Sequence, residues 1–488
     1  MPRLRVAAIA SLALIIVFTM AAGVTVARML PARLALWRLP VVASRGLTQA
    51  GPVLDPVPAA SAAGGATPRD GRSGPDATAA GVAAALAGEL GSAALGSHVG
   101  AEVADLSTGQ VLLSRQGDAG FAPASTAKLA VAVAALDVLG PAARFTTRVA
   151  PGAAPSSVVL VGGGDPTLAA GSPPAADYPQ PATLAALAAQ TARALRARGV
   201  RSVRLGYDTG LFTGPLMADG WPGSYVTSGN VTPIESLEVD QGRLTAGGAP
   251  EDADDPGNFR PRTFTPAAAA AQAFAAFLSA RGITVRGPVS PAVPRGRATI
   301  AAVSSPPLAE IVAQMLTESN NVIAENLARQ VAIATGRPAS FSGGAAAETA
   351  VLRRLGVRGE IRLFDGSGLS PLDRVTPDVL VQLIRLAAAP GRPGLRPVLT
   401  GLPVAGFSGT LAPGGSVFPD VGQAGLGLVR AKTGNLLTVV SLAGVAQARD
   451  GQLLAFAFMA DRLPKTGLDA GAAGLTSLAT ALAGCGCH

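Results

Sequence analysis

The sequence predicts an α+β fold in several domains, with a further α+β region inserted into the main one. The chain has 488 residues, which suggests about two to four domains. Its 49% hydrophobic content is too high for a disordered protein, and its 60 Gly and 39 Pro are too many for an all-helical one. Segments with helical spacing alternate along the chain with short apolar runs typical of strands.

The chain opens with an uncharged stretch, residues 6–27, which exceeds the about 20 apolar residues that span a bilayer. Residues 1–30 are therefore a retained membrane anchor or a cleaved signal peptide. We favour the anchor because the run is long for a signal peptide. Both alternatives place the rest of the chain outside the cytoplasm, in the cell envelope or secreted. Residues 31–78, rich in Gly, Pro, Ala and Ser towards their end, are predicted to be a flexible linker.

Residues 79–148 are predicted to form the first half of a discontinuous main domain. A helical pattern covers 79–96, and two short strands flank a turn at Ser107–Gly109. A second helix follows Pro123 and runs to Leu139.

Residues 149–299 are predicted to be an inserted region of one or two α+β modules. Many Gly and Pro turns separate its short strands from its helices. The predicted strands are 157–161, 200–205 and 283–285, and the predicted helices are 183–198 and 267–281.

Residues 300–484 complete the main domain. A helical pattern covers 308–335, two apolar runs around the turn at Arg449–Gly451 predict a central antiparallel hairpin, and 469–482 predicts a closing helix. The only cysteines, Cys485 and Cys487, end the chain, and we expect an exposed tail there rather than a metal site.

Charge and composition exclude several classes of function. The net charge of +8 favours an anionic partner such as a cell wall or lipid headgroups. The arginines are scattered and no nucleic-acid-binding motif occurs, so we expect no nucleic acid partner. With only two histidines and two cysteines, the chain is poorly equipped for a zinc site or a Ser-His-Asp triad. We expect neither a metal nor a cofactor.

The three lysines of the chain are more informative. Lys128 completes the motif Ser125-x-x-Lys128, and Lys432 begins Lys432-Thr433-Gly434 on an apolar strand pattern. Between them lies Ser319-Asn320-Asn321, within a helical region. Lys465 also begins Lys-Thr-Gly, but it follows a proline beyond the hairpin, and we interpret it as a coincidental surface match. Three motifs in order, each in a fitting local structure, predict one catalytic site.

The residue types suggest the chemistry. A serine hydroxyl needs a base, and Lys128, one helical turn from Ser125, can act as that base only as a neutral amine. Burial and the nearby charge of Lys432 would both lower its pKa. Ser319 could relay a proton to a leaving amine, and Asn321 could hold a substrate amide. Lys432 and Thr433 could bind a terminal carboxylate, and Gly434 would let a ligand lie against the strand. The N–H groups of Ser125 and Asn435 could form an oxyanion hole.

With these motifs the chain resembles the D-alanyl-D-alanine carboxypeptidase/endopeptidases of the class C low-molecular-mass penicillin-binding type, peptidase family S13. The likeness extends over about residues 80–480, and the wide spacing from Ser125 to Ser319 is similar to that of family members with inserted domains. Further segments also resemble the family's: 161–168, 220–222, 236–240, 365–370 and 402–411. The resemblance implies a penicillin-recognising, serine β-lactamase-like fold, with an antiparallel sheet and a helical lobe.

Two details of substrate recognition come only from this resemblance. Asp165 corresponds to a residue that in relatives helps to recognise the side chain of the peptide stem, although an Asp-Pro turn is an alternative explanation. Relatives often have an arginine directly after the segment 365–370, whereas this chain has Pro371 there and Arg374 three residues later.

We therefore expect an exported serine DD-peptidase that cleaves the terminal D-Ala-D-Ala bond of peptidoglycan stem peptides, and D-Ala cross-links as a further substrate. It would act through a Ser125 acyl-enzyme and take β-lactam antibiotics as covalent inhibitors. The alternatives are a β-lactamase or esterase on the same fold, and a non-catalytic peptidoglycan-binding protein. The large insertion and the lack of an evident deacylating glutamate argue against a class A β-lactamase.

Overall fold

The computed structural model describes residues 76–488, except 172, 174–177, 245–259, 414–417, 419–421 and 466. The predicted membrane anchor or signal peptide and the linker up to residue 75 lie outside these residues. Within the described residues, no helix combines the length and the apolar character that a bilayer crossing requires.

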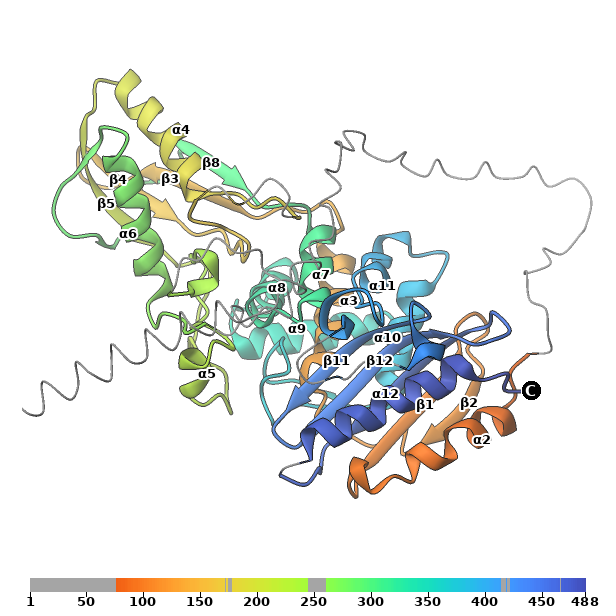
Figure 1. Ribbon diagram of the computed structural model, residues 1–488. Coiled ribbons are helices and arrows are strands. Elements are labelled where there is room, and N and C mark those ends of the chain that lie inside the picture. Colours follow the sequence, from red (N-terminus) through yellow and green to blue (C-terminus); the bar gives the residue numbers. More distant parts are fainter. Residues whose placement is uncertain are drawn as a thin grey trace, which may run out of the picture. The chain divides into compact units, whose positions relative to one another are not determined.

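A five-stranded antiparallel sheet forms the centre of the main domain, in the order β11-β12-β13-β1-β2 (Figure 1). Its three C-terminal strands are β11 (Val429–Leu436), β12 (Val439–Gln447) and β13 (Leu453–Ala460). They pair with β1 (Val99–Asp105), which is followed by β2 (Val111–Arg115). The central strands β1, β12 and β13 are almost wholly buried, because both faces of the sheet are covered. This explains why β12 and β13 are continuous apolar runs rather than alternating ones.

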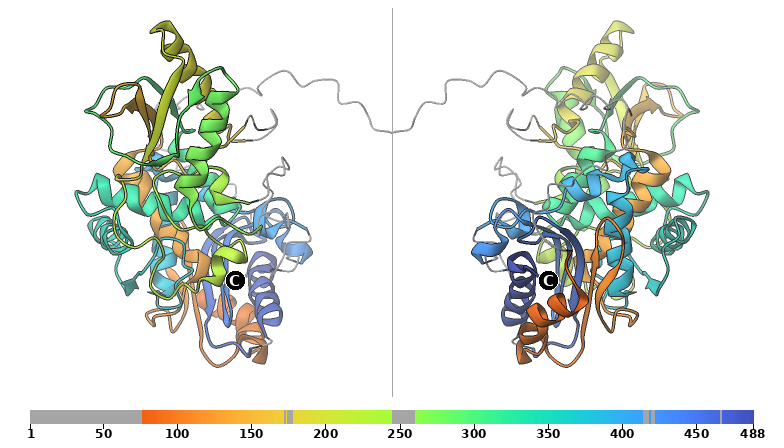
Figure 2. Two further views of the ribbon diagram at one scale, coloured as in Figure 1. Left: turned by 90° about the vertical axis from the view of Figure 1, so that its left-hand side faces the viewer. Right: turned by 90° about the vertical axis from the view of Figure 1, so that its right-hand side faces the viewer.

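Two helices cover one face of this sheet, α2 (Ala79–Leu90) and α12 (Leu468–Gly484), which lie beside each other in both views of Figure 2. The prediction of an exposed cysteine tail is wrong. Cys485 and Cys487 are 8% and 6% exposed and form a disulfide. The tail is buried because it packs against the start of α2, where the N–H of Thr78 donates to the carbonyl of Cys487 at 2.7 Å.

A lobe of helices covers the opposite face and shares an apolar core with it. Its main helices are α3 (Lys128–Leu139), α7 (Leu308–Thr317), α8 (Asn321–Ala334), α9 (Phe341–Arg354) and α10 (Pro377–Ala388), with the short α11 (Pro397–Thr400) and the two-stranded sheet of β9 (Ile361–Arg362) and β10 (Arg374–Val375). The predicted helical region 308–335 is in fact two helices, separated at residues 318–320 by a turn in which Ser319 has φ +58°. A left-handed residue cannot continue an α-helix, so the chain changes direction there.

A second, mixed sheet lies between Thr146 and Ser304, in the order β6-β5-β4-β3-β8 with β7 also paired to β5. Its strands are β3 (Thr146–Pro151), β4 (Ser157–Val161), β5 (Ser202–Asp208), β6 (Thr284–Val285), β7 (Ser290–Pro291) and β8 (Ala301–Ser304). The helices α4 (Leu184–Ala197) and α6 (Pro266–Ser279) pack on it around a separate apolar core. The parallel pairing of β4 with β5 follows from the crossover helix α4 between them.

Residues 212–243, which include the short helix α5 (Ser224–Thr227), connect β5 to the region before α6 but join neither sheet. We call them segment 212–243. Trp221, Val231 and Ile234 of this segment form a small apolar cluster with Val322 of α8 and Phe341 of α9. The segment therefore packs against the helical lobe of the main domain, next to the turn that contains Ser319.

Candidate active site

Ser125 and Lys128 begin the first helix of the lobe. Ser125 lies in a 3-10 turn, Ala124–Ala127, and α3 starts at Lys128. The Nζ of Lys128 lies 2.8 Å from the Oγ of Ser125. The predicted proximity of the two side chains is therefore confirmed, with a tighter first turn than an α-helix would give.

The Lys128 amine is completely buried and has three oxygen neighbours. It donates to Ser125 Oγ at 2.8 Å, to Asn321 Oδ1 at 2.7 Å and to the carbonyl of Ser367 at 2.8 Å. Burial lowers the pKa of Lys128 to about 7, although the carboxylates of Asp365 and Glu325 oppose this shift. A substantial fraction of this lysine is therefore a neutral amine at neutral pH, as a general base requires.

Lys432 of β11 lies in the same neighbourhood and is also completely buried. Its amine donates to the carbonyl of Thr433 at 2.7 Å. Burial, together with the charge of Lys128, holds the pKa of Lys432 well below its ordinary value. Within the described residues no carboxylate forms an ion pair with Lys432. The carboxylate of a bound ligand could therefore form the ion pair that Lys432 lacks within these residues.

Gly434 brings the edge strand β11 against the nucleophile. A Cβ atom at this position would come within 2.9 Å of both the Ser125 nitrogen and the Pro123 carbonyl oxygen, and within 2.3 Å of Ser441 Oγ. Contacts below 3.0 Å are too short for a side chain, so only glycine fits without rearrangement. The glycine is thus required by the packing of β11 against the Ser125 turn, whereas its predicted role in letting a ligand lie along the strand stays a prediction.

Among the described residues, the outer edge of β11 has no backbone hydrogen-bond partner next to this glycine. Ahead of it, residues 403–405 pair with the edge: Val429 accepts from the N–H of Ala405, and Ala431 donates to the carbonyl of Pro403. Backbone groups of a strand alternate in direction with a period of two, so the N–H groups of Thr433 and Asn435 point to the same outer edge. The N–H of Asn435 and that of Ser125, in the first turn of its helix, are therefore available for a ligand atom between them.

The motif Ser319-Asn320-Asn321 forms the turn between α7 and α8. Asn320 caps α8 by accepting from the N–H of Ile323, and Asn321 directs its Oδ1 to Lys128 and its Nδ2 to the carbonyl of Asn230 at 2.9 Å. Within the described part of the chain, the half-buried Ser319 hydroxyl makes no hydrogen bond.

Glu325 is a site residue that the sequence analysis missed. It lies one helical turn after Asn321 and is fully buried, and its carboxylate accepts from the N–H groups of Gly366 and Ser367 at 2.8 to 3.2 Å. These bonds fix the loop whose Ser367 carbonyl contacts Lys128. One turn further on, Arg329 forms an ion pair with Glu325 at 3.6 Å. The sequence signal was a Glu-x-x-x-Arg pair that begins four positions after a motif asparagine.

Asp165 and Arg374 do not reach this cluster. Asp165 is 3% exposed, and its Oδ1 accepts from the N–H and hydroxyl of Thr167. These bonds are those of an Asp-Pro turn, the alternative explanation for this residue. Burial raises its pKa to about 6. The place of Asp165 follows from Gln330 of α8, whose side chain donates to the carbonyl of Gly163, two residues before Asp165. Gln330 lies nine residues after Asn321, which is about 13 Å along the helix. The guanidinium of Arg374 donates to the carbonyl groups of Pro371 and Asp373 in its own loop.

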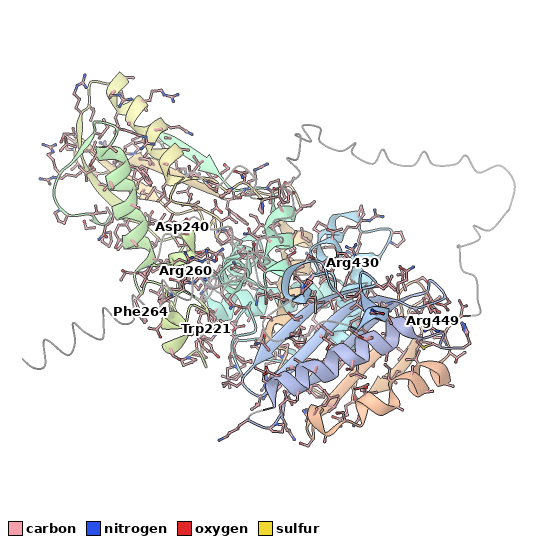
Figure 3. All side chains as sticks on the ribbon, in the orientation of Figure 1. Trp221, Asp240, Arg260, Phe264, Arg430 and Arg449 are labelled. Carbon is pink, nitrogen blue, oxygen red and sulfur yellow. A yellow bond between two sulfur atoms is a disulfide. The ribbon has the colours of Figure 1, made fainter. Side chains whose placement is uncertain are left out.

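Segment 212–243 forms a further side of this region, and Figure 3 labels two of its residues, Trp221 and Asp240. The indole of Trp221 donates to the Asp365 carboxylate at 2.7 Å. No three His, Cys, Asp or Glu side chains in the described ranges are grouped in a way that could hold a metal ion. The site therefore offers a serine, two buried amines, amides and backbone N–H groups as its chemistry.

Comparisons with known proteins show the family of the chain. The sequence profile of the "D-Ala-D-Ala carboxypeptidase 3 (S13) family" matches residues 82–258 and 245–482. "Carboxypeptidase DacB" of Mycolicibacterium smegmatis is 39% identical over 88% of this chain and 89% of its own length. The "D-alanyl-D-alanine carboxypeptidase" of Actinomadura sp. is 32% identical over 73% of this chain and 77% of its own.

A solved structure gives the same result for the fold. Penicillin binding protein 4 from Haemophilus influenzae superposes with a TM-score of 0.64 and 24% identity, covering 81% of this chain and 97% of that one. The predicted α+β multidomain, penicillin-recognising fold is thereby confirmed.

Proposed function

Because the chain belongs to the D-Ala-D-Ala carboxypeptidase 3 (S13) family, we propose that it is a serine DD-peptidase of the cell wall with Ser125 as its nucleophile. The observation that carries the assignment is the 2.8 Å contact between Ser125 Oγ and the buried Lys128 amine, whose pKa is about 7. The substrate is the D-Ala-D-Ala end of peptidoglycan stem peptides, and D-Ala cross-links are a second substrate of the same chemistry.

In acylation, neutral Lys128 takes the proton of Ser125, and Oγ attacks the carbonyl carbon of the penultimate D-Ala. The N–H groups of Ser125 and Asn435 stabilise the negative oxygen that forms. The bond to the terminal D-Ala then breaks, and its amine receives a proton from Lys128 through Ser319. Water hydrolyses the resulting ester with Lys128 again as the base, which restores the free serine.

Substrate binding involves the β11 edge and α8. Lys432 and Thr433 bind the terminal carboxylate, which gives the buried amine an ion-pair partner that no carboxylate of the described residues supplies. Asn321 holds the peptide amide through its Nδ2 group, which has two hydrogens and uses one for the Asn230 carbonyl. The Thr167 turn uses only Oδ1 of Asp165, so the stem side chain would be recognised through the buried Oδ2, which has no hydrogen-bond partner among the described residues.

Labelled penicillin tests the assignment. We expect the wild-type protein to be labelled covalently and the Ser125→Ala variant not to be; equal labelling of the two would falsify the choice of nucleophile. Rapid turnover of penicillin would instead favour the β-lactamase or esterase alternative. Labelling without release of D-Ala from a stem pentapeptide would favour a non-catalytic peptidoglycan-binding protein.

We further propose that residues 6–27 anchor the protein to the membrane, with the enzyme on the extracytoplasmic side. Their uncharged length supports this. The test is cell fractionation of two proteins: the full chain, and a variant that begins at residue 31 and is fused to a cleavable signal peptide. Recovery of both proteins in the soluble envelope fraction would rule out an anchor.

We also propose that residues 149–299 form an inserted domain within a catalytic domain made of 79–148 and 300–484. The separate apolar core around β3–β8 supports this division, with the sheet itself extending to Thr146 and Ser304. Limited proteolysis tests it. Cleavage sites concentrated near these boundaries are expected, whereas cuts spread evenly through the second sheet would contradict the division.

A further inference from the structure

Segment 212–243 lies within the inserted region, yet two of its hydrogen bonds are made with the Ser319-Asn320-Asn321 motif. The Asn230 carbonyl accepts from Asn321 Nδ2, and the Gln241 Oε1 accepts from Asn320 Nδ2, both at 2.9 Å. Two consecutive residues of the Ser319-Asn320-Asn321 motif are thus bound by the same segment. The third residue, Ser319, has no hydrogen bond of its own within the described residues, so its position depends on its neighbours.

The Asn320–Gln241 bond connects two strained turns. Ser319 has φ +58°, and across the bond Asp240 and Gln241 have φ +48° and +53°. Non-glycine residues in this left-handed region are energetically unfavourable and persist only where the surroundings enforce them. Such strained residues are concentrated at functional sites. The Asn320–Gln241 hydrogen bond is therefore a stronger candidate for a functional role than an ordinary surface hydrogen bond.

Gln241 is itself rigidly held. It is 4% exposed, its side-chain oxygen also accepts from Arg243 Nη2 at 3.2 Å, and its carbonyl accepts from Arg262 at 3.1 Å. The carboxylate of Asp240 accepts from the N–H of Ala170 at 3.0 Å. The acceptor that Gln241 offers to Asn320 is therefore fixed from several sides and does not depend on a flexible surface chain.

We propose that Gln241 is a positioning residue for catalysis. It holds Asn320, and through it the Ser319 turn, in the conformation in which the Ser319 hydroxyl serves the lysine amines. The inserted region would thus complete the active site and not only extend the chain. This inference rests on the proposed role of Ser319 in proton transfer.

Three single variants and one double variant test the proposal in the purified full chain. Gln241→Ala removes the acceptor, and Asn320→Ser breaks the same bond but keeps a good helix cap for α8. Each should slow acylation by penicillin about tenfold, the effect of one lost hydrogen bond. Both single variants break the same hydrogen bond, from Asn320 Nδ2 to Gln241 Oε1, so the double variant should lose little more than either single one. Gln241→Glu keeps an acceptor oxygen and should remain within about threefold of the wild type.

The control is Gln382→Ala, which removes a glutamine that binds Arg358 away from these motifs and should leave the rate unchanged. Hydrogen exchange gives a readout independent of activity: Gln241→Ala should accelerate exchange in residues 317–323 but not in α3. The proposal would be overturned if Gln241→Ala acylated and exchanged at wild-type rates. It would also be overturned if the losses in acylation rate of the two single variants multiplied in the double variant. Loss of labelling in the wild type would instead refute the proposed function, so the two failures are distinguishable.

Discussion

The low pKa of Lys128 predicts the pH dependence of acylation. Below a pKa of about 7 the amine carries a proton and cannot accept the one on Ser125, so the rate falls as the pH decreases. From the Henderson–Hasselbalch relation, about 1% of the amine is neutral at pH 5 and about 90% at pH 8. The second-order rate of acylation by penicillin should therefore rise about 100-fold between these values. With an ordinary lysine pKa of 10.5 the rate would instead keep rising about tenfold per pH unit through pH 8 and beyond, without levelling off near neutral pH.

The assay is stopped-flow or quenched labelling of the purified protein from pH 5 to pH 9. Glu325 titrates in the same range, because burial raises its pKa to about 7, and it needs a control. Glu325→Gln removes a negative charge that raises the pKa of Lys128, so the acidic limb should remain but move to lower pH. A flat profile, or a limb that disappears in Glu325→Gln, would refute Lys128 as the titrating base.

Four further predictions concern individual side chains. Lys128→Arg should acylate about 10²–10⁴-fold more slowly, since arginine keeps its proton at all accessible pH values; wild-type labelling of this variant would exclude Lys128 as the base. Lys432→Ala should impair a stem peptide with a free terminal carboxylate, mainly through a higher KM, more than it impairs the amidated peptide. Equal effects on both substrates would argue against carboxylate binding by Lys432. Gly434→Ala should abolish labelling and lower the melting temperature, because its Cβ meets the backbone at Ser125 within 2.9 Å; a normal acylation rate would mean that β11 can shift. Glu348 is fully buried, and burial raises its pKa well above the ordinary value, so the native state keeps a proton that the unfolded chain loses above about pH 4.5. Wild-type stability should therefore fall with rising pH relative to Glu348→Gln, and parallel denaturation curves at pH 5 and pH 8 would contradict this.

The sequence predicted the elements whose signals are local. The apolar runs of β12 and β13, the helix after Pro123 and the spacing of Ser125 and Lys128 all depend on neighbours within a few positions, and these features are found in the structure. The break in the helical region 308–335 was not predicted. Its apolar spacing continues through Ser319, and the left-handed conformation there is enforced by contacts from elsewhere.

The contacts that complete the site come from distant segments. Asn230 is 91 positions from Asn321, and the Ser367 carbonyl is 239 positions from Lys128. Both use backbone carbonyl groups, which every residue has, so no residue type marks them. Glu325 could have been noticed as the first member of a Glu-x-x-x-Arg pair that follows a motif asparagine, but its two N–H donors could not. The buried cysteine tail likewise depends on a contact with the start of α2, at the other end of the described residues.

The pairing of β1 with β13 has a consequence for how the protein reaches its native state. Val99 lies opposite Ala460, so the central sheet cannot close until nearly the whole chain is available. Such non-local pairing slows folding and leaves the apolar β1 without its partner in the meantime. The second sheet, by contrast, contains all of its strands between Thr146 and Ser304 and can assemble earlier. The turn that contains Ser125 lies against β11 at Gly434, so it gains this neighbour only once the C-terminal strands are in place.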